Sequence, residues 1–351
     1  MVDIQKLLRK NILELKPYSS ARDEYIGNIG IFLDANENSF GSIPEGKLNR
    51  YPDPHQRVIK EKLAEIKKLY LENIFIGNGS DEAIDLLIRA FCEPGKDSIL
   101  IMPPTYGMYK VAADINNIKT IEVPLTSDFQ IDTEKVIGSI TKFTKIIFIC
   151  SPNNPSGNLL NSKSISSILN FFNGIVIVDE AYIDFSKIDG WIDKLKVFNN
   201  LVVLQTFSKA WGLANIRVGI AFGDENIISI LNKIKYPYNV NGVSQKIIAD
   251  ALSAEYQKNI IVKNIISERE ILIGKLQKLP FVETVFPSDS NFLLVKVNNA
   301  NRIYNFLLRN KIIVRNRSNM INCSECLRFT IGTDIENITL IETLKMYEEE
   351  K

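Results

Sequence analysis

Short apolar runs recur along the first two thirds of the chain, and segments with helical periodicity lie between them. The clearest runs are residues 74–76, 98–101, 146–149, 175–178 and 201–204. Apolar runs of this length are typical of strands buried on both faces of a parallel sheet, and the intervening helices are the usual crossover connections. We therefore predict an α/β fold in which a mostly parallel central sheet is flanked by helices.

The helical segments begin and end at residues that suit helix termini. After residue 76, Gly77-Asn78-Gly79 predicts a tight turn, Ser80 is expected to cap a helix, and Pro94-Gly95 ends that helix. A further helix is expected at about 56–69. Apolar spacing at residues 3–14 predicts an amphipathic N-terminal helix.

The pattern changes near residue 241. Helices are expected at about 244–256, 258–279 and 300–310, and strands at about 281–286, 291–297, 312–314 and 327–331. Thr333 and Glu336 form a capping box that opens a last helix. We predict a smaller α+β domain here, so that the chain divides into an N-terminal arm (1–28), a large cofactor-binding domain (29–240) and a small C-terminal domain (241–351).

The composition is that of an ordinary soluble globular protein. The 351 residues include 42 Lys+Arg and 41 Asp+Glu, a formal net charge of +1. No long block of one sign suits nucleic acid or an anionic membrane, so any anion site must be local. The N-terminal residues lack the apolar region of a signal peptide, and no run is long enough to span a membrane. We expect a cytoplasmic protein.

The four cysteines are too few for a disulfide-stapled scaffold, which indicates a reducing compartment. Cys323 and Cys326 have the spacing of a redox or zinc motif. No second pair and no nearby histidine accompany them, because His55 is the only histidine of the chain. We expect half-buried cysteines at a strand end and no metal.

Polar side chains follow the predicted strands at their carboxyl ends. In chain order these are the glycine turn at Gly79, then Tyr106, Asn154, Asp179, Tyr182 and Lys209, with Arg217 eight residues further. Because the carboxyl ends of parallel strands share one edge of a sheet, and ligands bind at that edge, we expect these residues to line one pocket.

Lys209 lies just past a buried strand, where an ammonium group is costly to desolvate. It is either a surface lysine at a strand end or an amine kept for chemistry. Arg217 adds a fixed cation that suits an anionic, carbonyl-bearing ligand. The turn at Gly79 would present free N–H groups to a phosphate, although many strand-to-helix turns of this kind bind nothing.

Together these groups fit pyridoxal 5′-phosphate. This cofactor needs an amine for its aldehyde, an acid beside its pyridine nitrogen, donors for its phenolate oxygen, a ring to stack on and a cup for its phosphate. The candidates are Lys209 for the aldehyde, Asp179 for the nitrogen, Asn154 and Tyr182 for the phenolate, Tyr106 for stacking, and Gly79, Ser80, Asp81, Ser208 and Arg217 for the phosphate, with Thr206 also among the cofactor-binding residues.

These residues stand in motifs that extend over nearly the whole chain. The motifs are KPYSSAR, LDANEN, LNRYPDP, GSDEAIDLLIRAFCEPGKDSIL, PPTYGMY, SPNNPSG, VDEAY, SKAWGLANIRVG and CLRFTIGT. With them the chain resembles the fold-type I aminotransferases and, within that group, the histidinol-phosphate aminotransferase family. The resemblance implies transamination of L-histidinol phosphate with 2-oxoglutarate, giving imidazole-acetol phosphate and L-glutamate, in L-histidine biosynthesis. Lys209 would bind the cofactor aldehyde and, once released, move the substrate proton.

The resemblance also implies roles for residues away from the predicted strand ends. Tyr51 would reach the cofactor phosphate of a neighbouring subunit, which implies a homodimer. Tyr18, Asn36, Arg315 and Arg328 match substrate-binding positions, where the arginines would clamp a phosphate or carboxylate. An arginine within a strand, such as Arg328, also suits the exposed face of that strand.

Two positions depart from the family pattern. Serine replaces the commoner threonine in SPNNPSG, and Asn215 stands where glycine is expected. Relatives with this scaffold transaminate aromatic amino acids or decarboxylate threonine phosphate, so both activities stay as alternatives. A nucleotide-binding module without covalent chemistry is disfavoured because the turn after Ile76 lacks the dinucleotide and Walker glycine spacings.

Overall fold

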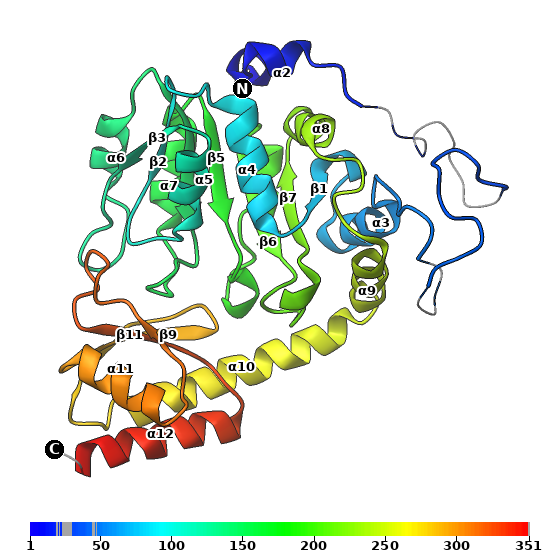
Figure 1. Ribbon diagram of the computed structural model, residues 1–351. Coiled ribbons are helices and arrows are strands. Elements are labelled where there is room, and N and C mark those ends of the chain that lie inside the picture. Colours follow the sequence, from blue (N-terminus) through cyan, green and yellow to red (C-terminus); the bar gives the residue numbers. More distant parts are fainter. Residues whose placement is uncertain (19, 21, 23–29, 44–45, 47, 350–351) are drawn as a thin grey trace.

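The computed structural model describes residues 1–351 except 19, 21, 23–29, 44–45, 47 and 350–351 (Figure 1). Its central sheet has seven strands in the order β1-β7-β6-β5-β4-β2-β3. The strands are β1 (Ile74–Gly77), β2 (Ser98–Ile101), β3 (Lys119–Glu122), β4 (Thr144–Cys150), β5 (Ile175–Asp179), β6 (Leu201–Thr206) and β7 (Gly219–Gly223). All neighbours are parallel except β7, which is antiparallel to β1 and β6. The predicted mostly parallel sheet is confirmed, but the strands β3 and β7 were not foreseen.

The register of the parallel strands brings their carboxyl ends together. Cys150 of β4 lies opposite Asp179 of β5, and Asp179 lies opposite Leu204 of β6. Because β6 continues to Thr206, the loop that carries Lys209 leaves the sheet beside the end of β5. This register therefore fixes an acid and an amine on the same edge of the sheet.

Helices cover both faces of the central sheet, and the strands alternate accordingly. In β4, Ile146 and Phe148 pack into one core with α4 (Ser80–Phe91), α5 (Met108–Ile115) and α8 (Glu225–Ile234). Ile147 and Ile149 pack into the other core with α3 (Arg57–Lys67), α6 (Thr133–Ser139), α7 (Ser162–Phe171) and α9 (Gly242–Leu252). Both faces are thus buried, which explains the uninterrupted apolar runs. Short 3-10 turns at η2 (Leu71–Asn73), η3 (Ile183–Phe185), η4 (Ile192–Lys196) and η5 (Ala214–Ile216) join these elements.

A second sheet lies below the carboxyl edge of the first (Figure 1). Its four antiparallel strands have the order β10-β11-β9-β8, and they are β8 (Val282–Val285), β9 (Phe292–Val297), β10 (Arg315–Asn316) and β11 (Cys326–Thr330). They pack with α10 (Glu255–Leu276), α11 (Ala300–Arg309) and α12 (Asp334–Glu349). The strand expected at 312–314 was wrong, because pairing with β11 begins only at Arg315.

The three-part division of the chain stays a prediction. The boundary proposed at residues 28 and 29 lies outside the described residues. Near the second boundary, α9 contributes Ile248 and Leu252 to a core of the central sheet, whereas α10 contributes Leu272 and Leu276 to the core of the second sheet.

Other local predictions were wrong in detail. The single helix expected at 3–14 is two helices, α1 (Ile4–Leu7) and α2 (Lys10–Glu14), because the Arg9 N–H bonds the Ala90 carbonyl and holds the chain extended between them. Ser80 is the first residue of α4 rather than its cap, which is Gly79. The Thr333–Glu336 capping box is confirmed, with Thr333 N–H at 2.8 Å and Glu336 N–H at 3.3 Å from their acceptors.

Two further observations concern burial and length. Cys323 and Cys326 are fully buried rather than half-buried, with 0% and 1% of their surface exposed. Across the part of the chain that the structure describes, no helix combines the length and apolarity needed to cross a bilayer.

The contact between β7 and the turn before α4 leaves no room for a side chain at Gly219. A methyl group there would collide with the backbone of Gly79 and Ser80, whereas one on Gly223 of the same strand would meet neighbours at 3.6 Å. We expect Gly219→Ala to lower the free energy of unfolding by about 1–3 kcal/mol, the usual cost of overpacking. Gly223→Ala, the matched control, should be neutral or stabilise by about 0.5–1 kcal/mol. Urea unfolding followed by circular dichroism measures both, and equal effects would contradict the close approach.

Candidate active site

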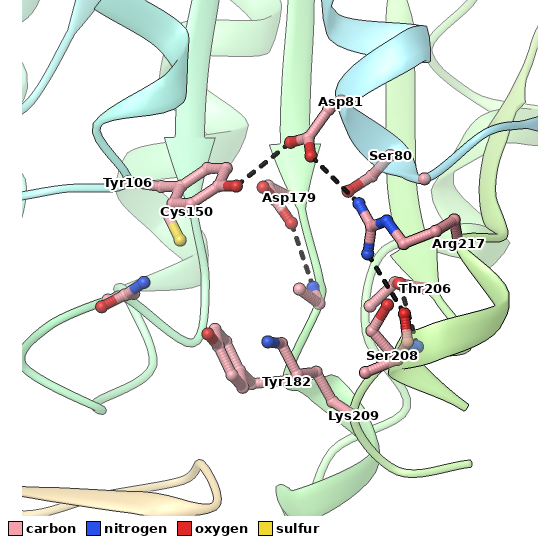
Figure 2. Close-up of a pocket in the computed structure, with 14 residues that line it drawn as sticks. Ser80, Asp81, Tyr106, Cys150, Asp179, Tyr182, Thr206, Ser208, Lys209 and Arg217 are labelled. Atoms are coloured by element: carbon pink, nitrogen blue, oxygen red, sulfur yellow. Dashed lines mark hydrogen bonds and ion pairs between the residues drawn. The ribbon is translucent and has the colours of Figure 1, made fainter. Parts of the chain in front are cut away.

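A pocket opens at the carboxyl ends of β4, β5 and β6. Its lining comes from residues far apart in the sequence: Gly79, Ser80, Asp81, Tyr106, Cys150, Asn154, Asp179, Ala181, Tyr182, Thr206, Ser208, Lys209, Ala214 and Arg217. Every predicted cofactor residue except Tyr51 is among them. Figure 2 shows the Lys209 and Tyr182 side chains on one side of this space, with Asp179 across from them.

Lys209 follows β6 in the loop between Thr206 and η5, and its side chain is half-buried. Its ammonium nitrogen lies 5.7 Å from the centroid of the Tyr182 ring. Within the described residues, no hydrogen bond or ion pair holds it. Burial lowers the pKa of Lys209, the Arg328 cation lowers it further, and Asp179 acts in the opposite direction. An amine in such surroundings is a better nucleophile than a surface lysine.

Asp179 is the last residue of β5 and is 3% exposed. One carboxylate oxygen accepts a hydrogen bond from the Tyr109 hydroxyl at 2.6 Å, and the other accepts one from the Ala181 N–H at 3.1 Å. Burial raises the pKa of Asp179, while these hydrogen bonds and the charge of Lys209 oppose that rise. The arrangement suits a carboxylate that meets a cation from the pocket side.

The turn before α4 and Arg217 form a cradle beside Lys209. Gly79 has φ 78°, and a methyl group built on it would lie 2.9 Å from Arg217 Nη2. The first N–H groups of the 12-residue helix α4 lack intrahelical acceptors. Arg217 adopts a left-handed φ of 57° and forms an ion pair with Asp81 at 3.5 Å. Free N–H groups, a helix N-terminus and an arginine are the usual components of a phosphate site.

The remaining predicted cofactor residues point into the same space. The Tyr106 hydroxyl donates to Asp81 at 3.1 Å, and the Ser208 N–H donates to the Thr206 hydroxyl at 3.1 Å. The Asn154 side-chain oxygen accepts a hydrogen bond from Arg328 Nη1. Arg328 is therefore directed towards the pocket and does not point away from the sheet into solvent.

Five predicted residues are not among those that line this pocket: Arg328, which bonds the lining residue Asn154, and the four that follow. Tyr18 is 77% exposed, and Asn36 and Tyr51 line a separate hollow with Tyr238, whose ring stacks on Tyr51 at 4.4 Å. Arg315 is exposed on β10, where it lies opposite Arg328 of β11.

Sequence reasoning missed two residues. Tyr109 bonds Asp179 from α5, and its place one helical turn after Tyr106 was the available signal. Arg317 directly follows β10, and its N–H bonds the Cys326 carbonyl of β11 at 2.9 Å. The pairing thus continues past β10, and the Arg317 side chain leaves the same face as those of Arg315 and Arg328. Burial, together with Arg328 and Arg315, lowers the pKa of Arg317 to about 10.

Arg317 and Arg328 lie close to each other beside the pocket, where Arg328 bonds the lining residue Asn154. Within the described chain, the Nε atoms of both are buried and have no hydrogen-bond partner, and neither residue forms an ion pair with an acid. Buried guanidinium groups without an acid are costly, so an anionic ligand would satisfy them. The described residues contain no cluster of metal-ligating side chains.

Comparison with known proteins agrees with this geometry. The sequence profile described as aminotransferase class I and II matches residues 33–344. The chain belongs to this family.

Relatives define the group more narrowly. The chain is 52% identical over 344 residues to the histidinol-phosphate aminotransferase of Cytophaga hutchinsonii (98% of this chain, 99% of the relative). It is 52% identical over 345 residues to the protein of the same name from Parabacteroides distasonis (98% and 99%). These matches confirm the predicted membership in the histidinol-phosphate aminotransferases.

Solved structures support the fold. The histidinol-phosphate aminotransferase of Clostridium acetobutylicum aligns with a TM-score of 0.80 and 26% identity, covering 87% of this chain and 92% of that chain. The enzyme of the same name from Sinorhizobium meliloti, solved in complex with pyridoxal-5′-phosphate, has a TM-score of 0.78 at 21% identity (89% and 90%). The predicted fold class is thus confirmed.

Proposed function

We propose that this protein transaminates L-histidinol phosphate with 2-oxoglutarate, giving imidazole-acetol phosphate and L-glutamate, as a cytoplasmic enzyme of L-histidine biosynthesis. The observation that carries the proposal is the pairing of Lys209 and Asp179 in one pocket at the ends of adjacent strands. The names of the relatives supply the substrate.

The pocket residues fit pyridoxal 5′-phosphate. Lys209 offers an amine for which the described residues supply no ion pair, and Asp179 offers a buried carboxylate for the pyridine nitrogen. In the cradle, a methyl group on Gly79 would lie 2.9 Å from Arg217 Nη2. Asn154, Tyr182 and Tyr106 would bind the ring, and Ser80, Asp81, Thr206, Ser208 and Arg217 would complete the site for the phosphate. When bound, the cofactor supplies an electron sink for the bond that breaks at the substrate α-carbon.

The residues of the chain have distinct tasks in this reaction. Lys209 takes the proton from the substrate and returns it, which its lowered pKa favours. Asp179 stabilises positive charge at the far end of the pocket. The Tyr182 ring packs edge-on against Phe292 of β9 at 5.0 Å, so it connects the two sheets at the pocket wall.

The arginines of the second sheet would bind the anionic groups of the substrates. Arg328 is held towards the pocket by Asn154, and Arg317 and Arg315 lie on the same face. Three cations suit a phosphate-bearing donor and a dicarboxylate acceptor better than a neutral aromatic side chain.

We further propose a homodimer in which Tyr51 and Tyr18 serve the neighbouring active site. Tyr51 is 51% exposed, and its backbone N–H donates a hydrogen bond to the Glu37 carboxylate at 2.6 Å. Exposed apolar residues of the same segment, Ile31 at 92% and Phe40 at 103%, would be covered by a second subunit.

A donor screen tests the reaction. Purified protein loaded with pyridoxal phosphate should form glutamate from 2-oxoglutarate with histidinol phosphate at a kcat/KM at least about tenfold above that with phenylalanine. Threonine phosphate should release no carbon dioxide. Lys209→Ala should abolish turnover, because it removes the group that moves the proton. Carbon dioxide release, or a preference for phenylalanine, would favour one of the alternative activities.

Subunit mixing tests the shared site. At limiting cofactor, both the Lys209→Ala protein and the Tyr51→Phe protein should have low transaminase activity. A refolded equimolar mixture should recover roughly a quarter of wild-type activity, since half of the dimers are mixed and each carries one intact site. Activity of the mixture no higher than that of Tyr51→Phe alone would show that Tyr51 serves its own subunit or none.

Arg317→Gln tests the missed arginine. We expect KM for histidinol phosphate to rise at least about tenfold with a smaller change in kcat, because a hydrogen bond to a charged group contributes about 1.5–3 kcal/mol. Arg309→Gln on the exposed side of α11 is the control and should leave both constants unchanged. An unchanged KM in Arg317→Gln would remove this residue from the substrate site.

A further inference from the structure

Tyr109 is buried behind the pocket and bonds its acid directly. The side chain is 0% exposed, and its hydroxyl donates to Asp179 Oδ2 at 2.6 Å. The ring is fixed on two sides: it stacks on Phe148 of β4 at 4.6 Å and 14°, and meets the Tyr106 ring edge-on at 5.5 Å and 84°. The donor is therefore held in one place by packing.

The surroundings of Asp179 make this donor important. Among the described residues, its other oxygen accepts a hydrogen bond from the Ala181 N–H alone, at 3.1 Å. The charged groups that act on it are Asp81 from α4, which opposes ionisation, and Lys209 after β6, which favours it. Glu180 follows Asp179 directly after the end of β5, and its own carboxylate accepts a hydrogen bond from the Trp191 N–H at 2.6 Å.

One thiol and one hydroxyl group complete the environment of Asp179. Cys150 at the end of β4 lies beside both Tyr109 and Asp179, and burial keeps its thiol neutral by raising its pKa. Burial next to Asp179 also raises the pKa of Tyr109 well above the ordinary value. The Tyr109 hydroxyl thus keeps its proton and remains a donor throughout the working pH range.

We propose that Tyr109 is a positioning residue that keeps the Asp179 carboxylate ionised and directed at the pyridine nitrogen of the cofactor. The proposal rests on the function proposed above. Each hydrogen bond that a carboxylate accepts stabilises its charged form and makes it less basic. With Tyr109 in place, the proton that Asp179 and the ring nitrogen share stays on the nitrogen. Without it, the proton moves towards Asp179 and the ring withdraws electrons less strongly.

The hydroxyl is not needed for packing. Phenylalanine would fill the same space between Phe148 and Tyr106, and it would not bury a polar atom that requires a partner. A core that only had to be filled could use phenylalanine here. The hydroxyl must therefore act on Asp179, and the effect should be electrostatic.

The test is Tyr109→Phe, with Tyr347→Phe as the matched control. Tyr347 is 2% exposed on α12 in the core of the second sheet. In Tyr109→Phe we expect about a tenfold higher dissociation constant for pyridoxal phosphate, measured by adding cofactor to stripped protein. We also expect the pH midpoint of the visible absorbance band of the loaded enzyme to rise by about one unit, which is the same tenfold factor. The control should move neither value.

A double-mutant cycle shows whether Tyr109 acts through Asp179. In the Asp179→Asn background, Tyr109→Phe should change the cofactor dissociation constant less than twofold. Full additivity, or an unchanged pH midpoint in folded Tyr109→Phe, would overturn the proposal. If Tyr109→Phe fails to fold, Tyr109→His offers a smaller ring with a donor, and its midpoint should lie nearer that of the wild type than the midpoint of Tyr109→Leu does.

These measurements separate the two proposals. A wild-type protein that binds no pyridoxal phosphate contradicts the proposed function itself. A wild-type protein that binds it, with a titration that Tyr109→Phe leaves unchanged, contradicts only the role of Tyr109.

Discussion

The buried charge of Asp179 is the constraint around which the site is built. Removing a carboxylate from water costs several kcal/mol, and this cost must be offset by partners in the fold. Tyr109 and the Ala181 N–H supply one hydrogen bond to each oxygen, and bonds of this kind to a charged group contribute about 1.5–3 kcal/mol each. These two hydrogen bonds do not offset the whole cost of burying the carboxylate, and a cation on the pocket side would offset the remainder. Asp179 is consequently placed to receive a protonated ring.

The sheet makes this arrangement possible and also limits it. The carboxyl ends of β4, β5 and β6 bring Cys150, Asp179 and the Lys209 loop to one edge. The antiparallel strand β7 then packs Gly219 against the turn before α4, so the phosphate cradle is part of the sheet's own packing. A shift in that packing would therefore move the cradle and Lys209 together.

Much of this could be predicted from the sequence because it depends on local patterns. Uninterrupted apolar runs identified the parallel strands, and the polar residue after each run identified the pocket, including Asn154, Asp179 and Lys209. The strand β7 was missed because Gly219–Gly223 is short and rich in glycine, which carries little strand signal.

What could not be predicted depends on tertiary pairing. Tyr109 has the appearance of an ordinary core residue on an amphipathic helix, and only the packing of α5 against β4 and β5 brings its hydroxyl to Asp179. The position of Arg317 could be known only from the pairing of β10 and the residue after it with β11, which places Arg317 on the face that Arg315 and Arg328 share.

The distribution of charge across the pocket determines where a second anion can bind. On the side of the central sheet, Arg217 is already paired with Asp81, and the cradle there is matched to one phosphate. On the side of the second sheet, Arg317 and Arg328 have buried Nε atoms without partners. Like charges on one face of a strand pair are destabilising, and an anionic ligand bound between them would offset that cost. In the proposed function, the phosphate of the substrate would therefore bind on the side of the second sheet, with Lys209 between the two anions.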